Sequence, residues 1–242
     1  MADLVSVRRL SFLLAAGAAL YLFTAVSDVV PALPWFRANV MVSLACALTL
    51  IALFVVGLAP LRALGHRLLA VASVALPLAM LSTYLGWLPA SNLAKVVFAV
   101  ALGLWLAAQI ESLRVIAVIA AVAALVDIYS VFLGPTRALL SHAPQTLPYF
   151  AVALTWFGYS YREAYSAIGT SDLIFFGLYL GAAFVFRLRR AATVVVMTAS
   201  FLVTVALALW GFSALPALPL LSAAFLAVNA DLLWKGRRAA DR

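Results

Sequence analysis

The sequence predicts an all-α protein, a polytopic bundle of transmembrane helices with about eight spans, nine being the alternative count. Hydrophobic residues make up 67% of the 242-residue chain and charged residues only 10%. Soluble domains are about half apolar and about a quarter charged, so this balance excludes a cytosolic enzyme, a disulfide-rich secreted module and a disordered chain. Apolar runs of the length that crosses a bilayer, about 20 residues, also recur along the chain. The lipid bilayer is therefore the expected solvent of this protein.

Eight apolar runs are expected to be spans. The first, Leu10 to Val30, follows Arg8 and Arg9, but it is longer than the hydrophobic region of a signal peptide, about 7 to 15 residues, and should persist as a span. The other expected spans are 39–59, 68–88, 93–110, 113–133, 171–186, 192–212 and 216–234. Residues 1–112 are expected to form a scaffold of four helices, and residues 113–242 to carry the function.

The basic residues predict the orientation of the chain. Lys and Arg collect on the cytoplasmic side of membrane proteins. With a cytoplasmic N-terminus, all but four of the 16 basic residues fall on that side, the exceptions being Arg37, Lys95, Arg137 and Arg162. We therefore expect an integral, multi-pass protein with both termini in the cytoplasm and the connection 134–170 outside.

The connection 134–170 contains an apolar stretch from Leu147 to Gly158. This stretch is about half the length needed to cross the bilayer. An interfacial or loop-packing segment is the favoured interpretation, and the alternative is a re-entrant piece or a strand that lines a site.

Two aspartates fall within expected spans. Asp127 lies inside the run 113–133, and Asp172 is at the start of the run 171–186. A carboxyl group inside a membrane helix is unfavourable by about 2.5 to 3.5 kcal/mol, so each residue is a functional candidate. Taken alone, Asp172 also suits a helix cap, and Asp127 also suits an ion site, a proton relay or a hydrogen bond between helices.

The two aspartates are expected at the same depth. Asp127 comes 13 residues after Arg114, and Asp172 comes 15 residues before Arg187. At about 1.5 Å per residue, the two lie about 20 and about 22 Å from these cytoplasmic arginines. This common depth favours a paired role over two independent ones.

Small residues lie near both aspartates. Ala120, Ala123 and Ala124 precede the first aspartate on the same side of its helix, which allows another helix to approach closely. Gly177 and Gly181 form a GxxxG pair after the second aspartate. This pair falls on roughly the opposite face from that aspartate and is not expected to join the two helices.

A proline-interrupted segment precedes the last expected span. Residues 214–219 read Ala-Leu-Pro-Ala-Leu-Pro, and Leu218 comes 17 residues before Lys235. That separation is about 25 Å along a helix, which puts the segment near the layer of the two carboxyl groups.

The order of these elements resembles a known family. Three segments carry the resemblance: Asp127-Ile-Tyr-Ser-Val-Phe-Leu-Gly-Pro, then Gly169-Thr-Ser-Asp172, then Pro216-Ala-Leu-Pro219. They are similar to the motifs of the presenilin and signal peptide peptidase family of intramembrane aspartyl proteases. The chain resembles a divergent, prokaryotic-type member of that family. Those proteases have one aspartate in each of two adjacent spans and a Pro-Ala-Leu motif at the last span. The resemblance covers about residues 113–234 and implies a presenilin-like fold.

The resemblance also implies a function and a site. It implies hydrolysis of peptide bonds within transmembrane helices or signal peptides, which are then the expected partners besides the lipid bilayer. The catalytic residues would be Asp127 and Asp172. The residues that would bind substrate and shape the active site are Gly169, Pro216, Ala217, Leu218 and Pro219. Two carboxyl groups suffice for such general acid–base chemistry, so neither a metal nor a cofactor is expected.

Two alternatives from other classes remain open. A proton-coupled transporter or channel would use the same two carboxyl groups as relay sites. A catalytically inactive, presenilin-like protein that binds membrane helices is the second, because Ser171 stands where the family has glycine.

Other reactive side chains are few. His66 and His142 lie near expected loops without a second ligand at metal-binding spacing. Cys46 is the only cysteine, so no internal disulfide can form, and a small buried residue is expected there. The net charge of +8 is expected to orient the chain in the membrane rather than to bind nucleic acid.

Overall fold

The structure, a computed structural model, describes residues 2–160, 165–210 and 215–233. Helices dominate this part of the chain, as the sequence predicts. They are α1 Ala2–Val26, α2 Phe36–Leu58, η1 Ala59–Leu64, α3 Arg67–Tyr84, α4 Leu88–Ala108, α5 Leu113–Phe132, α6 Pro135–His142, η2 Pro144–Thr146, α7 Leu147–Phe150, α8 Thr170–Val185, α9 Arg190–Leu209 and α10 Leu218–Val228. The strands β1 Ala151–Thr155 and β2 Tyr165–Gly169 form an antiparallel hairpin.

Six of these helices are long and apolar enough to cross a membrane. They are α1, α2, α3, α4, α5 and α9. The expected spans 171–186 and 216–234 correspond to the shorter apolar helices α8, of 16 residues, and α10, of 11 residues. The number of eight spans therefore stays a prediction. The described residues form a helix bundle with six candidate membrane-spanning helices.

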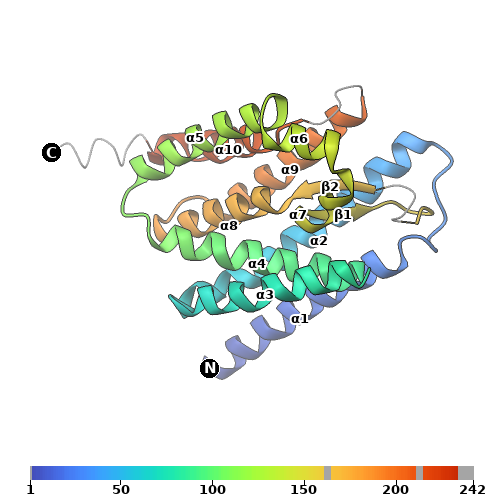
Figure 1. Ribbon diagram of the computed structural model, residues 1–242. Helices are drawn as coiled ribbons and strands as arrows, with labels where there is room; N and C mark the ends of the chain where they lie inside the picture. The colour runs from blue at the N-terminus through green and yellow to red at the C-terminus, as the bar shows by residue number, and fades with distance from the viewer. Residues whose placement is uncertain (1, 161–164, 211–214, 234–242) are drawn as a thin grey trace.

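Helix α8 lies in the middle of the bundle (Figure 1). It packs along α4 on one side and contacts α9 and α10 on the other, while α3 covers α4 and α1 packs on α2 and α4. Helix α5 packs mainly on α10. The start of α1 and the end of α10 lie at the same end of the bundle (Figure 1), an arrangement that suits termini on one side of the membrane.

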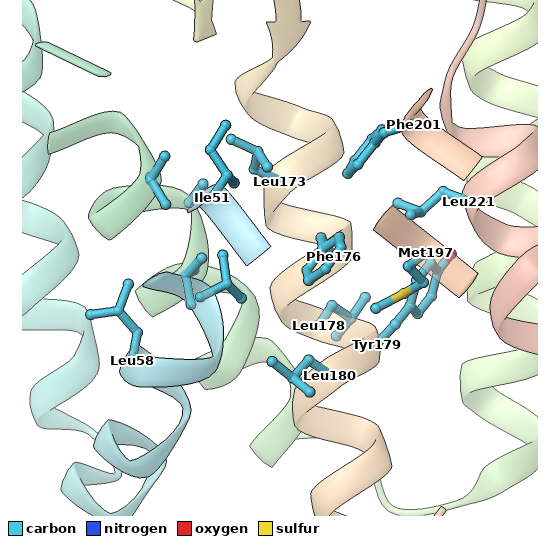
Figure 2. Close-up of a cluster of buried hydrophobic side chains, with 14 of the residues drawn as sticks. Ile51, Leu58, Leu173, Phe176, Leu178, Tyr179, Leu180, Met197, Phe201 and Leu221 are labelled. Carbon is cyan, nitrogen blue, oxygen red and sulfur yellow. The ribbon is translucent and has the colours of Figure 1, made fainter. Parts of the chain in front are cut away.

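The hydrophobic core surrounds α8 (Figure 2). Figure 2 shows side chains of α8 directed toward Ile51 and Leu58 of α2 on one side, and toward Phe201 of α9 and Leu221 of α10 on the other. Tyr179 of α8 is fully buried, stacks on the Phe225 ring at 4.6 Å and is within 2.8 Å of the Ser222 hydroxyl. The core therefore holds α8, and with it the start of that helix, in a fixed position.

Glycines allow α4 and α8 to approach closely. A Cβ atom at Gly103 of α4 would clash with the backbone carbonyl of Ile174, and it would lie 2.7 Å from the backbone nitrogen of Leu178. On α8, a Cβ at Gly177 would lie 3.1 Å from Val100, and one at Gly181 would lie 2.5 Å from the Ala107 side chain. The GxxxG pair thus faces α4, in agreement with the expectation that it does not join the two aspartate helices.

Substitution of Gly103 by alanine is expected to destabilise the bundle by about 3 kcal/mol or more. Overpacking typically costs about 1 to 3 kcal/mol, and here the obstacle is backbone, which no rotamer change can move aside. Thermal unfolding in detergent would measure the loss. The control is Ala121→Val on the exposed face of α5, which should leave the unfolding midpoint unchanged. An unchanged midpoint in Gly103→Ala would contradict the close packing of α4 on α8.

The small alanine residues of α5 allow another helix to pack closely on this helix, as predicted. Ala120 and Ala123 are buried, and α10 is the main neighbour of this helix. Val118, Val122 and Leu125 on the other side are more than half exposed. Because an apolar side chain is stable when exposed to lipid, this face suits contact with the bilayer. Helix α5 thus presents one face to α10 and leaves an apolar face exposed on the other side.

Candidate active site

A cavity of about 510 Å³ lies where the hairpin meets the helix bundle. Its wall includes both aspartates, Asp127 of α5 and Asp172 of α8, together with parts of α6, α7, β2 and α9 and residues 215–217. Most of the other lining side chains are apolar. The structure therefore brings together the two acidic residues that the sequence singles out, in a largely apolar enclosure.

The two aspartate helices meet at this cavity rather than along their lengths. Helix α5 packs mainly on α10 and α8 packs mainly on α4, and each of the two aspartate helices contributes one carboxyl group to the wall of the cavity. Two carboxyl groups in such an environment favour a state in which they share one proton.

Asp127 is held by the start of the last helix. Its Oδ2 atom accepts a hydrogen bond of 3.0 Å from the backbone N–H of Leu218. Leu218 is the first residue of α10, and the first N–H groups of a helix have no partner within that helix. The carboxylate therefore satisfies a free donor and benefits from the positive end of the helix dipole.

Asp172 is the third residue of α8 and is 8% exposed. Its Oδ2 atom accepts a 3.2 Å hydrogen bond from the backbone N–H of Gly169, the residue that precedes the helix. The helix-cap interpretation is thus correct in part, because the carboxyl group stabilises the start of α8 from inside the first turn. The same residue also lines the cavity, so capping does not account for its position alone.

The Pro-Ala-Leu-Pro segment contributes in two different ways. Pro216 and Ala217 line the cavity. Leu218 is 5% exposed and takes part through its backbone N–H, while its side chain belongs to the hydrophobic core. Pro219 is at the second position of α10, where its missing N–H is not needed. Of the seven predicted site residues, five line the cavity, namely Asp127, Gly169, Asp172, Pro216 and Ala217.

The structure corrects the favoured interpretation of the apolar stretch 147–158 as an interfacial or loop-packing segment. Ala151–Thr155 is a strand, β1, buried over most of its length and paired with β2 in the register Ala151↔Gly169 and Thr155↔Tyr165. An interfacial or loop-packing segment is therefore wrong for these residues, and the alternative of a strand beside the site is correct. A short apolar run fits a strand and a packed loop equally well by its pattern alone.

Two buried polar side chains of α4 hold the outer edge of β1. Asn92 donates to the carbonyl of Ala153 at 2.7 Å and accepts from its N–H at 3.0 Å. One turn later, the Lys95 Nζ atom donates to the carbonyls of Pro148 and Ala151, the latter at 3.1 Å. Asn92 and Lys95 are 1% and 3% exposed. Together they supply the partners that a further strand would otherwise provide.

These contacts leave β2 as the open edge of the hairpin. In an antiparallel pair, the N–H and C=O of one residue point to the same side of its strand. Those of Ala153 point to Asn92, so those of the opposite residue, Ala167, point away from β1. Tyr165, Ala167 and Gly169 line the cavity. The open strand edge therefore runs beside the two carboxyl groups.

Sequence reasoning counted Lys95 among the basic residues of the outer side, near the start of the expected span 93–110, and gave it no structural role. Helix α4 starts at Leu88, so Lys95 lies inside it, buried against the hairpin. Asn92 was missed as well. The available signal was the spacing of the two polar residues, three apart at the start of an apolar helix and hence on one face. Of the other external basic residues, Arg162 lies outside the described residues.

No metal site accompanies the carboxyl groups in the part of the chain that the structure describes, where no three His, Cys, Asp or Glu side chains form a group that could hold an ion. Comparisons with protein-family models, with curated proteins and with solved structures gave no match. The function of the site is therefore inferred from its own geometry.

Proposed function

We propose that this protein is an intramembrane aspartyl protease of the presenilin and signal peptide peptidase type, which hydrolyses peptide bonds within transmembrane helices or signal peptides. One observation carries the proposal: Asp127 and Asp172 line one cavity beside an open strand edge and the Pro-Ala-Leu segment. Neither carboxyl group has a basic side chain as its hydrogen-bond partner in the described residues, since each accepts from backbone N–H. Both remain available for proton transfer.

The reaction needs one proton on the pair. The ionised carboxylate takes a proton from a water molecule, whose oxygen attacks the scissile carbonyl carbon. The protonated carboxyl group donates to the developing oxyanion, and the tetrahedral intermediate then collapses as the amine leaves with a proton. The apolar walls of the cavity strengthen these electrostatic interactions because they exclude bulk water.

The substrate is a helix that must be opened before cleavage, since its peptide bonds are paired within the helix. The β2 edge, with Tyr165 and Ala167 on the cavity wall, supplies backbone groups for an extended segment to pair with. Pro216 and Ala217 face the same space. Unwinding and positioning are thereby coupled, because backbone groups that the substrate frees from its own helix pair with the groups of this strand.

Cleavage of a transmembrane-helix reporter by the purified protein in liposomes tests this function. We expect products whose new termini, mapped by mass spectrometry, fall within the reporter's apolar segment. The double variant Asp127→Ala/Asp172→Ala should give none, and Glu111→Ala, in the exposed turn before α5, should cleave normally.

Two results would overturn the proposal. Cleavage that survives the double substitution would remove the aspartates from the mechanism. Absence of cleavage together with aspartate-dependent proton flux into the liposomes would indicate the transporter instead, and reporter binding without either activity would indicate an inactive helix-binding protein.

A further inference from the structure

Four arginines gather at the end of the bundle where α2 and α8 end and α9 starts. Arg62 of η1 and Arg190 of α9 lie on the same aromatic ring, with their guanidinium carbons 4.0 and 4.4 Å from the centroid of Phe184. Arg9 of α1 lines a groove together with Pro60 of η1, two residues before Arg62. Arg8 lines the same groove, which has a volume of about 410 Å³. We call Arg8, Arg9, Arg62 and Arg190 the arginine cluster.

The arginine cluster has no acidic partner in the described part of the chain. The ion pair that forms nearby joins Arg189 to Asp231 and uses neither Arg62 nor Arg190. Like charges on one ring repel each other, and attraction to the ring offsets only part of this repulsion. A bound anion would remove the repulsion.

The geometry leaves the donors of these arginines available. The attraction of the Arg62 and Arg190 guanidinium groups to the Phe184 ring does not use up their hydrogen-bond donors, and each guanidinium group carries five N–H donors. Arg62 uses one donor for the carbonyl of Ala59. The remaining N–H groups form the fork that binds two phosphate oxygens at once.

The groove beside the arginine cluster combines charged and apolar residues. Phe12 of α1, Val56 and Gly57 of α2 and Pro60 of η1 line it together with Arg8 and Arg9. Such a lining suits an amphipathic ligand, with a phosphate at the arginines and a hydrocarbon chain against the apolar residues. Basic pockets between membrane helices bind anionic headgroups in this way.

We propose that the arginine cluster binds the phosphate of an anionic phospholipid whose acyl chain occupies the groove along Phe12 and Val56. Bound there, the lipid bridges α1, the end of α2 and the start of α9. Helix α9 also contributes Phe201 and Thr204 to the cavity wall, so the lipid stabilises one wall of the candidate active site from a distance. The inference does not depend on the proposed proteolytic function.

The test compares lipids on the purified protein in detergent. Phosphatidylglycerol is expected to raise the thermal unfolding midpoint by about 5 °C or more over phosphatidylcholine, as mass action predicts for a ligand of the folded state. The double variant Arg62→Gln/Arg190→Gln should lose this shift. Arg37→Gln, at the exposed opposite end of α2, is the matched control and should keep it.

A second measurement on the unaltered protein covers the case in which the double variant does not fold. Native mass spectrometry should retain phosphatidylglycerol in preference to phosphatidylcholine when the two are supplied together. Equal retention of the two lipids, or a shift in the double variant equal to that of the control, would overturn the proposal. An equal shift with inorganic phosphate alone would also overturn it, because the site would then bind a free anion rather than a lipid.

Discussion

Asparagine at position 127 or at position 172 is expected to lower cleavage by about 1,000-fold or more. General acid–base catalysis contributes about 10² to 10⁴-fold, and a pair that shares one proton loses its function when either member is removed. Asparagine keeps the shape and can still accept the N–H of Leu218 or of Gly169 through its oxygen. The thermal unfolding midpoint should therefore change little.

The matched control is Asp28→Asn, an exposed carboxyl group in the turn after α1, which should retain full activity. The double asparagine variant should be no worse than either single variant, because the pair acts as a unit. The unaltered protein should show a bell-shaped dependence of cleavage rate on pH, since activity needs one proton on the two groups. A single variant with substantial activity would contradict a shared-proton mechanism.

Substitution of Lys95 by methionine is expected to lower kcat/KM by about 100-fold without removing either carboxyl group. Methionine preserves much of the volume and removes the donor that holds the carbonyls of Pro148 and Ala151. A displacement of about 1 Å in a positioning element can cost about 100-fold in rate. The loss of global stability should be smaller than the broken contacts suggest, because a buried charge is removed as well.

Hydrogen exchange distinguishes positioning from general destabilisation. Amide exchange should accelerate in β1 and β2 of Lys95→Met, while α8 and α9 stay protected. Gln109→Met, at the exposed end of the same helix, controls for the introduced side chain. Loss of protection throughout the bundle would instead assign Lys95 to the stability of the whole fold, and unchanged cleavage would show that the hairpin needs no such support.

The sequence predicted the helices well because the bilayer imposes a strong pattern on them. An apolar run such as 39–59 has few other structures open to it, and α2 occupies Phe36–Leu58. The common depth of Asp127 and Asp172 followed from helical rise alone, and the structure brings both to one cavity.

What the sequence could not predict depends on contacts between distant segments. Asn92 and Lys95 looked like residues near a helix end, and nothing in their neighbourhood identifies Ala153, 61 positions away, as the partner of Asn92. The helix that packs on Gly177 and Gly181 could not be predicted either. A pattern of small residues indicates that a close neighbour exists, but not that this neighbour is α4.

The shortness of α8 changes the depth at which water meets the protein. Its 16 residues extend for about 24 Å, less than the hydrocarbon thickness of about 30 Å. Its neighbour α10, with 11 residues, is shorter still. Because α8 is enclosed by α4, α9 and α10, the layer beyond its first residue is occupied by the hairpin, the cavity and residues 215–217 rather than by hydrocarbon. Irregular backbone at this depth is tolerated where it lines a cavity. Water is thus expected to reach Asp172 through this protein-lined space, without crossing the full hydrocarbon layer.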